Sequence, residues 1–166
     1  LAAAEELARA PLGQTRVTVL LTGSEESGLW GVRHFLEKEE MEYCEALFLN
    51  VDNVGGGTLR FSSSEGMLSP VPILPEIKAF LTALPAGPTG EKIPVAPYTW
   101  CLTDASPLIF MGWQATSLIA LDERGMPLHW HRQSDAVDNL EPANLERATA
   151  ALVAAARRWD EVSGPA

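Results

Sequence analysis

Apolar and polar positions along the chain predict several short strands. Three apolar runs have the length and the β-branched content of buried strands: residues 17–21 (VTVLL), 46–51 (ALFLNV) and 117–121 (SLIAL). Residues 59–63 form a shorter and more polar run, which is typical of a strand near the edge of a sheet. The sequence therefore predicts a sheet of at least four strands.

Helical periodicity separates these runs. Apolar residues of the stretch 25–40 fall on one helical face, and these are Leu29, Val32, Phe35 and Leu36. Further helices are predicted over residues 76–84, where Pro75 suits the first turn, and over the alanine-rich residues 144–162. Residues 86–97 are rich in Gly and Pro and predict a surface loop.

Strands separated by helices are typical of an α/β domain with a mostly parallel sheet. No linker divides the chain, so residues 1–166 are interpreted as one domain. Residues 1–10 (LAAAEELARA) predict a helix with no capping residue before it and no initiator Met. This start lacks the basic and apolar regions of a signal peptide. Because the chain opens in the middle of a predicted helix, we expect it to be a piece of a longer protein.

Composition and charge exclude several classes of protein. Hydrophobic residues make up 46% of the 166 positions, which argues against a disordered chain. Twelve basic against 22 acidic residues give a net charge of −10, which disfavours a nucleic-acid partner. No apolar run approaches the roughly 20 residues of a membrane-spanning helix. Cys44 and Cys101 cannot build a disulfide framework, so a cytoplasmic or a secreted soluble protein is equally compatible.

Polar residues follow the predicted strands at their carboxyl ends. Glu25 and Glu26 follow the first strand, Asp52 ends the second, and His129 and His131 lie shortly after the third. In open α/β sheets, side chains at these ends converge on ligands, and carboxylates with imidazole suit zinc. Taken singly, each has a structural explanation: glutamates at a helix start meet the helix dipole, and Asp-Asn after a strand is a turn.

Four stretches of the chain carry motifs in a fixed order. Residues 17–38 (VTVLLTGSEESGLWGVRHFLEK) contain a predicted strand, a Gly-x-Glu-Glu-x-Gly-Leu-x-Gly turn and a predicted helix. Residues 50–55 (NVDNVG) end a strand with Asp-x-x-Gly, residues 103–108 (TDASPL) contain Asp-x-x-Pro, and residues 131–135 (HRQSD) form His-x-x-x-Asp after Trp130. Together they resemble the motifs of the co-catalytic zinc aminopeptidases of metallopeptidase family 28, the bacterial leucine aminopeptidase type. The family's versions of the last two are Ser-Asp-x-x-Pro-Phe and a His-x-x-x-Asp with Tyr in the place of Trp130.

The resemblance implies roles for four residues. Glu25 would be the general base and acid that takes a proton from metal-bound water and passes it to the leaving amine. Glu26 and His131 would ligate one zinc ion, and Asp52 would ligate a second. The implied activity is the removal of N-terminal residues from a peptide substrate, with two zinc ions in the full-length enzyme and no nucleic-acid or membrane partner.

The resemblance also implies a three-layer α/β/α sandwich of zinc-exopeptidase type, around a mostly parallel mixed sheet that lacks its N-terminal strands. In the family, a His-x-Asp and a metal-bridging Asp precede the Glu-Glu motif, so this chain would be the C-terminal part of the catalytic domain. A catalytic zinc normally holds three protein ligands, so we expect weak zinc binding and little hydrolysis by this chain alone. We also expect it to self-associate, or to pair with the missing N-terminal segment beside residues 17–21.

Other polar residues near the motifs are open to two interpretations. Asp104 either lines the pocket behind the metal ligands or forms an ordinary turn, and Asp135 either orients the His131 imidazole or caps a turn. Trp130 is expected in the pocket, and His129 in the pocket or at the surface. His34 is expected to be solvated.

Two other functions remain open. One is a non-catalytic binding module of the same fold, because a fold alone does not determine function. The other is a glutaminyl cyclase, which shares the fold with a single zinc. The joint presence of Glu25, Glu26, Asp52 and His131 favours descent from an enzyme, and the wording of the Glu-Glu motif favours the peptidase.

Overall fold

The main sheet has four strands in the order β1-β6-β2-β5. A computed structural model of the chain describes residues 1–38, 46–87 and 90–163. The strands are β1 (Phe48–Asp52), β6 (Ala115–Leu121), β2 (Thr58–Ser62) and β5 (Val95–Ala96). β1 runs parallel to β6 and β2 parallel to β5, whereas β2 runs antiparallel to β6. The predicted α/β fold with a mixed, mostly parallel sheet is confirmed.

Strand β6 forms the centre of the core. All seven of its residues are buried, including Leu118 and Ile119, because β1 and β2 flank it and helices pack around the sheet. Leu59 and Phe61 of β2 complete the buried centre. A strand covered on both faces needs apolar side chains at nearly every position, which explains why the run at 117–121 was recognisable from the sequence.

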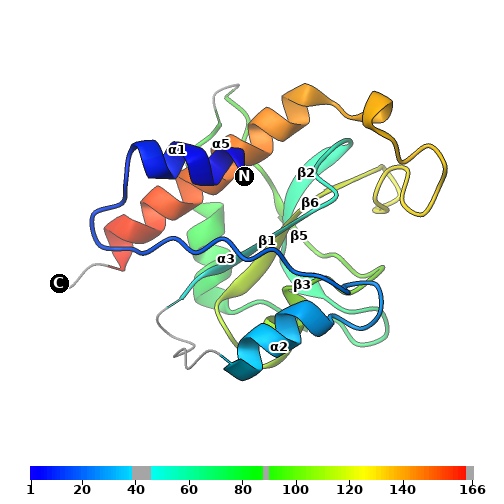
Figure 1. Ribbon diagram of the computed structural model, residues 1–166, viewed down its shortest axis with the longest axis horizontal. Helices are drawn as coiled ribbons and strands as arrows, with labels where there is room; N and C mark the ends of the chain where they lie inside the picture. Colours follow the sequence, from blue (N-terminus) through cyan, green and yellow to red (C-terminus); the bar gives the residue numbers. More distant parts are fainter. Residues whose placement is uncertain (39–45, 88–89, 164–166) are drawn as a thin grey trace.

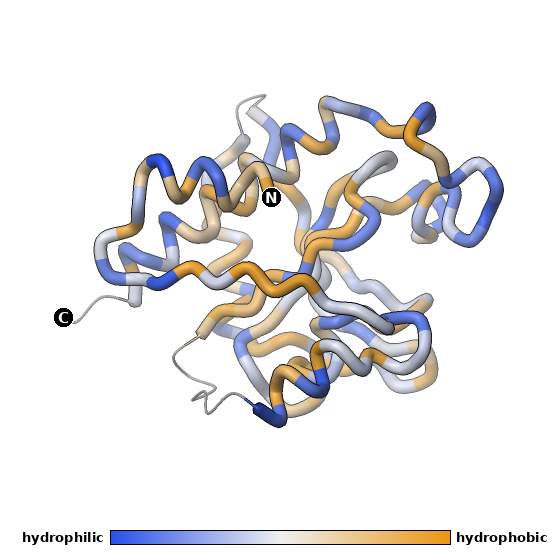
Figure 2. Tube along the Cα trace, in the orientation of Figure 1, coloured by the Kyte–Doolittle hydropathy of each residue, from blue (hydrophilic) through white to orange (hydrophobic). Residues whose placement is uncertain are grey.

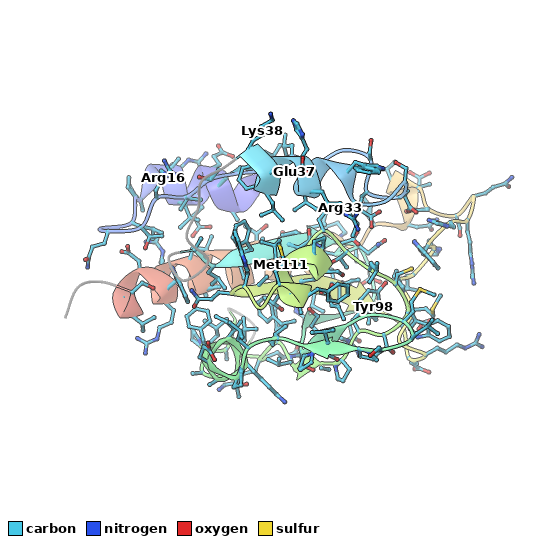
Figure 3. The ribbon with its side chains drawn as sticks, turned by 90° about the horizontal axis from the view of Figure 1, so that it is seen from below. Arg16, Arg33, Glu37, Lys38, Tyr98 and Met111 are labelled. Carbon is cyan, nitrogen blue, oxygen red and sulfur yellow. The ribbon has the colours of Figure 1, made fainter. Side chains whose placement is uncertain are left out.

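Five α-helices pack around this sheet. They are α1 (Ala2–Arg9), α2 (Trp30–Lys38), α3 (Pro75–Thr82), α4 (Ser106–Phe110) and α5 (Pro142–Val162). Helices α1, α3 and α5 gather on one side of the strands and α2 lies on the other, as Figure 1 shows. In Figure 3, turned by 90°, α1 and α2 both lie along the upper side, with the strands below them. The rings of Phe80 and Trp159 join α3 to α5 edge to face, with centroids 5.5 Å apart.

The smaller elements connect these layers. They are a two-stranded sheet of β3 (Ser64–Glu65) and β4 (Val71–Pro72), and the 3-10 helix η1 (Val137–Asn139). No helix among the described residues has both the length and the apolar character to cross a membrane. Cys101 is a free thiol, whereas Cys44 and the predicted helix end at residue 40 lie outside the described residues.

The strand predicted over residues 17–21 is wrong. These residues run in an extended line past the sheet (Figure 1), and their backbone makes no hydrogen bond to another described residue. Their apolar side chains are 39–79% exposed at Val17, Val19, Leu20 and Leu21. The composition is that of a strand, but strand structure requires a neighbouring backbone, and none in the described chain lies within reach.

Both ends of this extended segment are nevertheless fixed. The carboxylate of Asp160 on α5 accepts hydrogen bonds from the backbone N–H groups of Gly13, Gln14 and Thr15, at 2.7–2.8 Å. These bonds, led by that of Gln14, lower the pKa of Asp160 to about 2. At the other end, Thr22 Oγ1 donates to Asp104 Oδ2 at 2.5 Å.

Two further expectations need correction. The strand predicted near the sheet edge at 59–63 is β2, which lies inside the sheet, because its polar Ser62 is fully buried and hydrogen-bonded rather than solvated. The helix predicted from residue 25 begins at Trp30, because Ser24 and Leu29 adopt positive φ values of 58° and 60° that interrupt a right-handed helix.

Truncation of Leu118 tests the central position of β6. Leu118→Ala removes a fully buried side chain, so the free energy of unfolding is expected to fall by about 2–5 kcal/mol. Val137→Ala, at a 76% exposed position, is the control and should change it by less than about 0.5 kcal/mol. Chemical denaturation measures both, and equal effects would contradict the assignment of the core.

Candidate active site

The Glu25–Glu26 turn is packed onto the first turn of α2. Gly31 N donates to Gly23 O at 3.0 Å, and Leu29 N donates to Glu25 O at 2.9 Å. A Cβ at Gly31 would lie 2.5 Å from that Gly23 oxygen, so this close approach requires glycine. The turn leaves Glu25 half-buried and Glu26 exposed.

His131 lies in the loop that follows β6. His129 and His131 both have positive φ values, 61° and 55°, which turn the backbone sharply on either side of Trp130. The ring of His129 is tied to Ser134, whose Oγ lies 2.9 Å from Nδ1. The ring of His131 instead stacks against Trp130, with ring centroids 4.2 Å apart.

The structure brings His131 and Glu26 into direct contact. His131 Nε2 lies 2.7 Å from Glu26 Oε1, although the two residues are 105 positions apart in the chain. Their side chains are 56% and 69% exposed, so the pair is accessible to solvent and to a ligand. A carboxylate and an imidazole from two distant segments of the chain therefore lie side by side on the surface of the protein.

Asp52 and Glu25 belong to the same electrostatic environment. Burial raises the pKa of Asp52. A hydrogen bond from the Asn53 backbone lowers this pKa in part, and the nearby charges of Asp104 and Glu26 raise it further. Burial also raises the pKa of Glu25, with Glu26, Asp52 and Asp104 adding to the shift and His131 opposing it. Four carboxylates thus repel one another around one imidazole, an arrangement that favours a bound cation.

Backbone strain is concentrated around these residues. Among the described residues other than glycine, those with positive φ are Ser24, Leu29, Asn53, His129 and His131. Ser24 and Leu29 lie on either side of Glu25 and Glu26, and Asn53 directly follows Asp52. The other two, His129 and His131, belong to the loop after β6, called the histidine loop below. Unfavourable backbone conformations that gather at one place are typical of functional sites.

Asp104 is more deeply buried than the exposed Glu26–His131 pair. It is only 9% exposed, and its Oδ2 accepts the hydrogen bond from Thr22. Its Oδ1 is buried and has no hydrogen-bond partner in the described part of the chain. A buried carboxylate oxygen without a partner costs free energy and points to a donor or cation that the described residues do not supply.

Glu65 was missed by sequence reasoning. Its fully buried carboxylate accepts hydrogen bonds from Ser62, Thr103 and Ser106, at 2.6–2.8 Å. The last two residues flank Asp104, so Glu65 holds the turn that presents it. No signal in the sequence distinguishes this glutamate, because two of its three donors, Thr103 and Ser106, lie in a distant segment of the chain.

The remaining candidates lie apart from the contact. Asp135 is exposed, and its side chain makes no hydrogen bond to a described residue, while its backbone N–H donates to Arg132 O in a turn. His34 is exposed on α2, with Nδ1 3.9 Å from Glu37 Oε2. Neither reaches the Glu26–His131 pair.

The donor types suit zinc, but the set is incomplete. A carboxylate oxygen and an imidazole nitrogen are two of the usual three protein ligands of a catalytic zinc. The described residues contain no group of three or more His, Cys, Asp and Glu side chains positioned to hold a metal ion. The pair therefore fits part of a metal site.

Replacement of Asp52 tests the electrostatic environment in chelator-treated protein. Because the pKa of Asp52 is raised on folding, its ionised form disfavours the folded state, and Asp52→Asn should increase the free energy of unfolding at pH 7. The gain should shrink as the pH falls and vanish below about 3.8, where the carboxyl is protonated in both states. Asp135→Asn removes one exposed negative charge and is the matched control. A gain that persists at acid pH would contradict this account.

Comparison with known proteins gives one positive result. The family model described as Peptidase family M28 matches residues 1–156, which include every candidate residue above. A search of curated proteins found no match. The family match spans nearly the whole chain, the sheet is the expected mixed α/β type, and the chain belongs to peptidase family M28.

Proposed function

We propose that this chain carries part of the active site of a zinc-dependent aminopeptidase, in which Glu26 and His131 bind zinc and Glu25 moves the proton. The observation that carries the proposal is the contact of 2.7 Å between Glu26 Oε1 and His131 Nε2, in a chain that belongs to a peptidase family. The two ligand types are those of a catalytic zinc site. Their exposure leaves room for a substrate.

Glu25 has the properties of a general acid and base. When bound, zinc would polarise a carbonyl oxygen and lower the pKa of a water molecule towards neutrality. Glu25 is the chain neighbour of Glu26 and makes no hydrogen bond to His131, so its carboxyl stays available to accept and return a proton. Its raised pKa brings it closer to the working pH, as proton transfer requires.

The negative charge of the site supports an aminopeptidase. The ammonium group of a free N-terminus would be attracted by Glu25, Glu26, Asp52 and Asp104, whose charges reach one another. The carboxylate of a free C-terminus would be repelled by the same four groups. The net charge of −10 acts in the same direction on an approaching peptide.

Zinc binding by this chain alone is proposed to be weak. Glu26 and His131 supply two ligands for one ion, and Asp52 supplies one for a second, whereas a catalytic zinc normally has three protein ligands. We therefore propose that the chain by itself hydrolyses peptides slowly.

Zinc titration tests the metal ligands. We expect zinc to be removed readily by chelator, and Glu26→Gln and His131→Gln each to weaken binding by at least about 10-fold. His34→Gln is the matched control, because His34 also lies beside a glutamate on the surface but outside the site. Calorimetric titration measures the affinities. Two tightly bound ions per chain, or unchanged binding by His131→Gln, would show that the ligands are misassigned.

Hydrolysis of two substrates tests the activity. With excess zinc, leucine p-nitroanilide should be cleaved slowly, and its N-acetylated form should not be cleaved, because the acetyl group removes the ammonium charge. Glu25→Gln should lower the zinc-dependent rate by at least about 100-fold and leave zinc affinity unchanged. Equal cleavage of both substrates would contradict the proposal. Cyclisation of an N-terminal glutamine would instead indicate a glutaminyl cyclase, and peptide binding without turnover a binding module.

A further inference from the structure

We propose that Arg60 and Tyr98 bind a carboxylate of the peptide substrate beside the candidate active site, so that the site prefers an acidic residue at the N-terminus of the peptide. The side chains of both residues carry hydrogen-bond donors that no described residue accepts. The inference rests on the proposed aminopeptidase function for the identity of its ligand, whereas the carboxylate site itself does not depend on zinc.

Arg60 lies in the same row of the sheet as Asp52. Ile119 of β6 pairs with Asp52 of β1 on one side and with Arg60 of β2 on the other. Residues paired in this way project from the same face of a sheet, so these three side chains share one face. Two strand spacings of about 4.8 Å put the Cα atoms of Asp52 and Arg60 about 10 Å apart. A cationic side chain is therefore within reach of a small molecule bound at Asp52.

The guanidinium of Arg60 has no counter-ion in the described part of the chain. Its Nε is buried and makes no hydrogen bond, and no described Asp or Glu forms an ion pair with it. Arg147, which is also partly buried, instead pairs with Glu91 at 3.1 Å. A buried N–H group without an acceptor costs free energy, and a planar carboxylate is the acceptor that best fits a guanidinium. The state of Arg60 therefore points to a carboxylate ligand.

Tyr98 supplies a second donor on the same face of the sheet. It is 3% exposed and belongs to a small cluster with Ile119 and Leu121, against which Cys101 packs. Its hydroxyl makes no hydrogen bond to a described residue. Burial raises the pKa of this hydroxyl, and Cys101 and Asp52 add to the shift, so the group stays protonated and remains a donor at neutral pH. The influence of Asp52 also indicates that the hydroxyl lies near the candidate active site.

The two donors lie away from the place expected for the missing N-terminal strands. Those strands are expected beside residues 17–21, an exposed apolar stretch that is orange in Figure 2 and that lines one groove together with β1. β2 is separated from β1 by β6 and has β5 on its other side. A strand added beside β1 would lie about three strand spacings, or about 14 Å, from β2. Its absence therefore does not explain why Arg60 and Tyr98 lack partners.

The charges of the site indicate which carboxylate of the peptide binds. Because the four carboxylates around Asp52 attract the ammonium group, the first residue of the peptide lies next to them. The side chain of that residue is then the part of the peptide nearest to Arg60. An aspartate or glutamate side chain would accept hydrogen bonds from the guanidinium and from the Tyr98 hydroxyl. The C-terminal carboxylate of a dipeptide is the other source of the same chemistry, and the experiment separates the two.

Titration of small ligands in chelator tests the carboxylate site without zinc. Glutamic acid α-amide and glutamine amide differ only in the side-chain carboxylate, and the dipeptide Leu-Gly differs from its amide only in the C-terminal carboxylate. We expect glutamic acid α-amide to bind at least about 10-fold more tightly than glutamine amide and to shift the NMR signal of the Arg60 Nε–H group. A preference confined to Leu-Gly over its amide would keep the site and overturn its assignment to the N-terminal side chain. Equal binding within both pairs would overturn the proposal.

Variants of the chain show whether Arg60 causes the preference. Arg60→Gln should reduce the preference for glutamic acid α-amide to less than about 3-fold, whereas Arg60→Lys, which keeps the charge, should retain part of it. Arg158→Gln is the matched control, because it removes the same charge from an exposed ion pair with Glu161 on α5 and should leave the preference unchanged. A full preference in Arg60→Gln would overturn the proposal. If Arg60→Gln does not fold, the ligand pairs on the parent chain and on Tyr98→Phe, which should lower the preference, decide the question.

Hydrolysis separates this inference from the proposed function. With excess zinc, glutamic acid α-(p-nitroanilide) should have a KM at least about 10-fold lower than glutamine p-nitroanilide, with a similar kcat, and Arg60→Gln should remove the difference. Cleavage of neither substrate, with carboxylate-dependent binding intact, would contradict the aminopeptidase and support the carboxylate site. Cleavage of both with equal KM would support the aminopeptidase and overturn the carboxylate site.

Discussion

The buried carboxylate of Glu65 is the constraint on which the geometry of the site depends. A carboxylate inside a protein is tolerated only where donors replace its hydration, and here Ser62, Thr103 and Ser106 do so. These donors come from β2, from the turn that leads into α4 and from the first residue of α4. Ser117 of β6 extends the network to Thr103, with their hydroxyl oxygens 2.7 Å apart, so one polar cluster joins the interior strands to that turn.

The candidate active site is assembled outward from this cluster. The turn held by Glu65 presents Asp104, and Asp104 accepts the hydrogen bond of Thr22, three residues before Glu25. Gly31 at the start of α2 then donates a hydrogen bond to Gly23, which packs the Glu25–Glu26 turn against α2. The histidine loop after β6 brings His131 to Glu26 from the other direction. The exposed pair thus depends on buried contacts several residues away.

The sequence predicts the fold well where the apolar pattern within a single strand or helix is enough to identify that element. β6 is apolar because both of its faces are covered, and its sequence alone shows this. Residues 17–21 have the same kind of sequence and yet form no strand, because a pattern of side chains does not reveal whether a neighbouring backbone is present. Ser62 looked like an edge residue for a related reason: its burial depends on Glu65, which lies outside its own strand.

The same distinction applies to the site. The spacing from His131 to Asp135 favoured His131 over His129 as the ligand, and it is His131 that contacts Glu26 in the structure. The contact itself, like the hydrogen bond from Thr103 to Glu65, joins residues from distant segments of the chain, so no short sequence motif predicts it. The same holds for the buried Asp104 oxygen that lacks a partner, because its burial depends on the whole fold. Such features follow from the packing of the whole sheet, and only three-dimensional coordinates reveal them.

X-ray absorption at the zinc edge tests most directly the claim that Glu26 and His131 form a metal-binding pair. For the zinc-loaded chain, the account predicts one imidazole nitrogen and otherwise oxygen neighbours at about 2.0–2.2 Å, without sulfur. A spectrum with sulfur at about 2.3 Å, or without the outer-shell scattering of an imidazole ring, would contradict it.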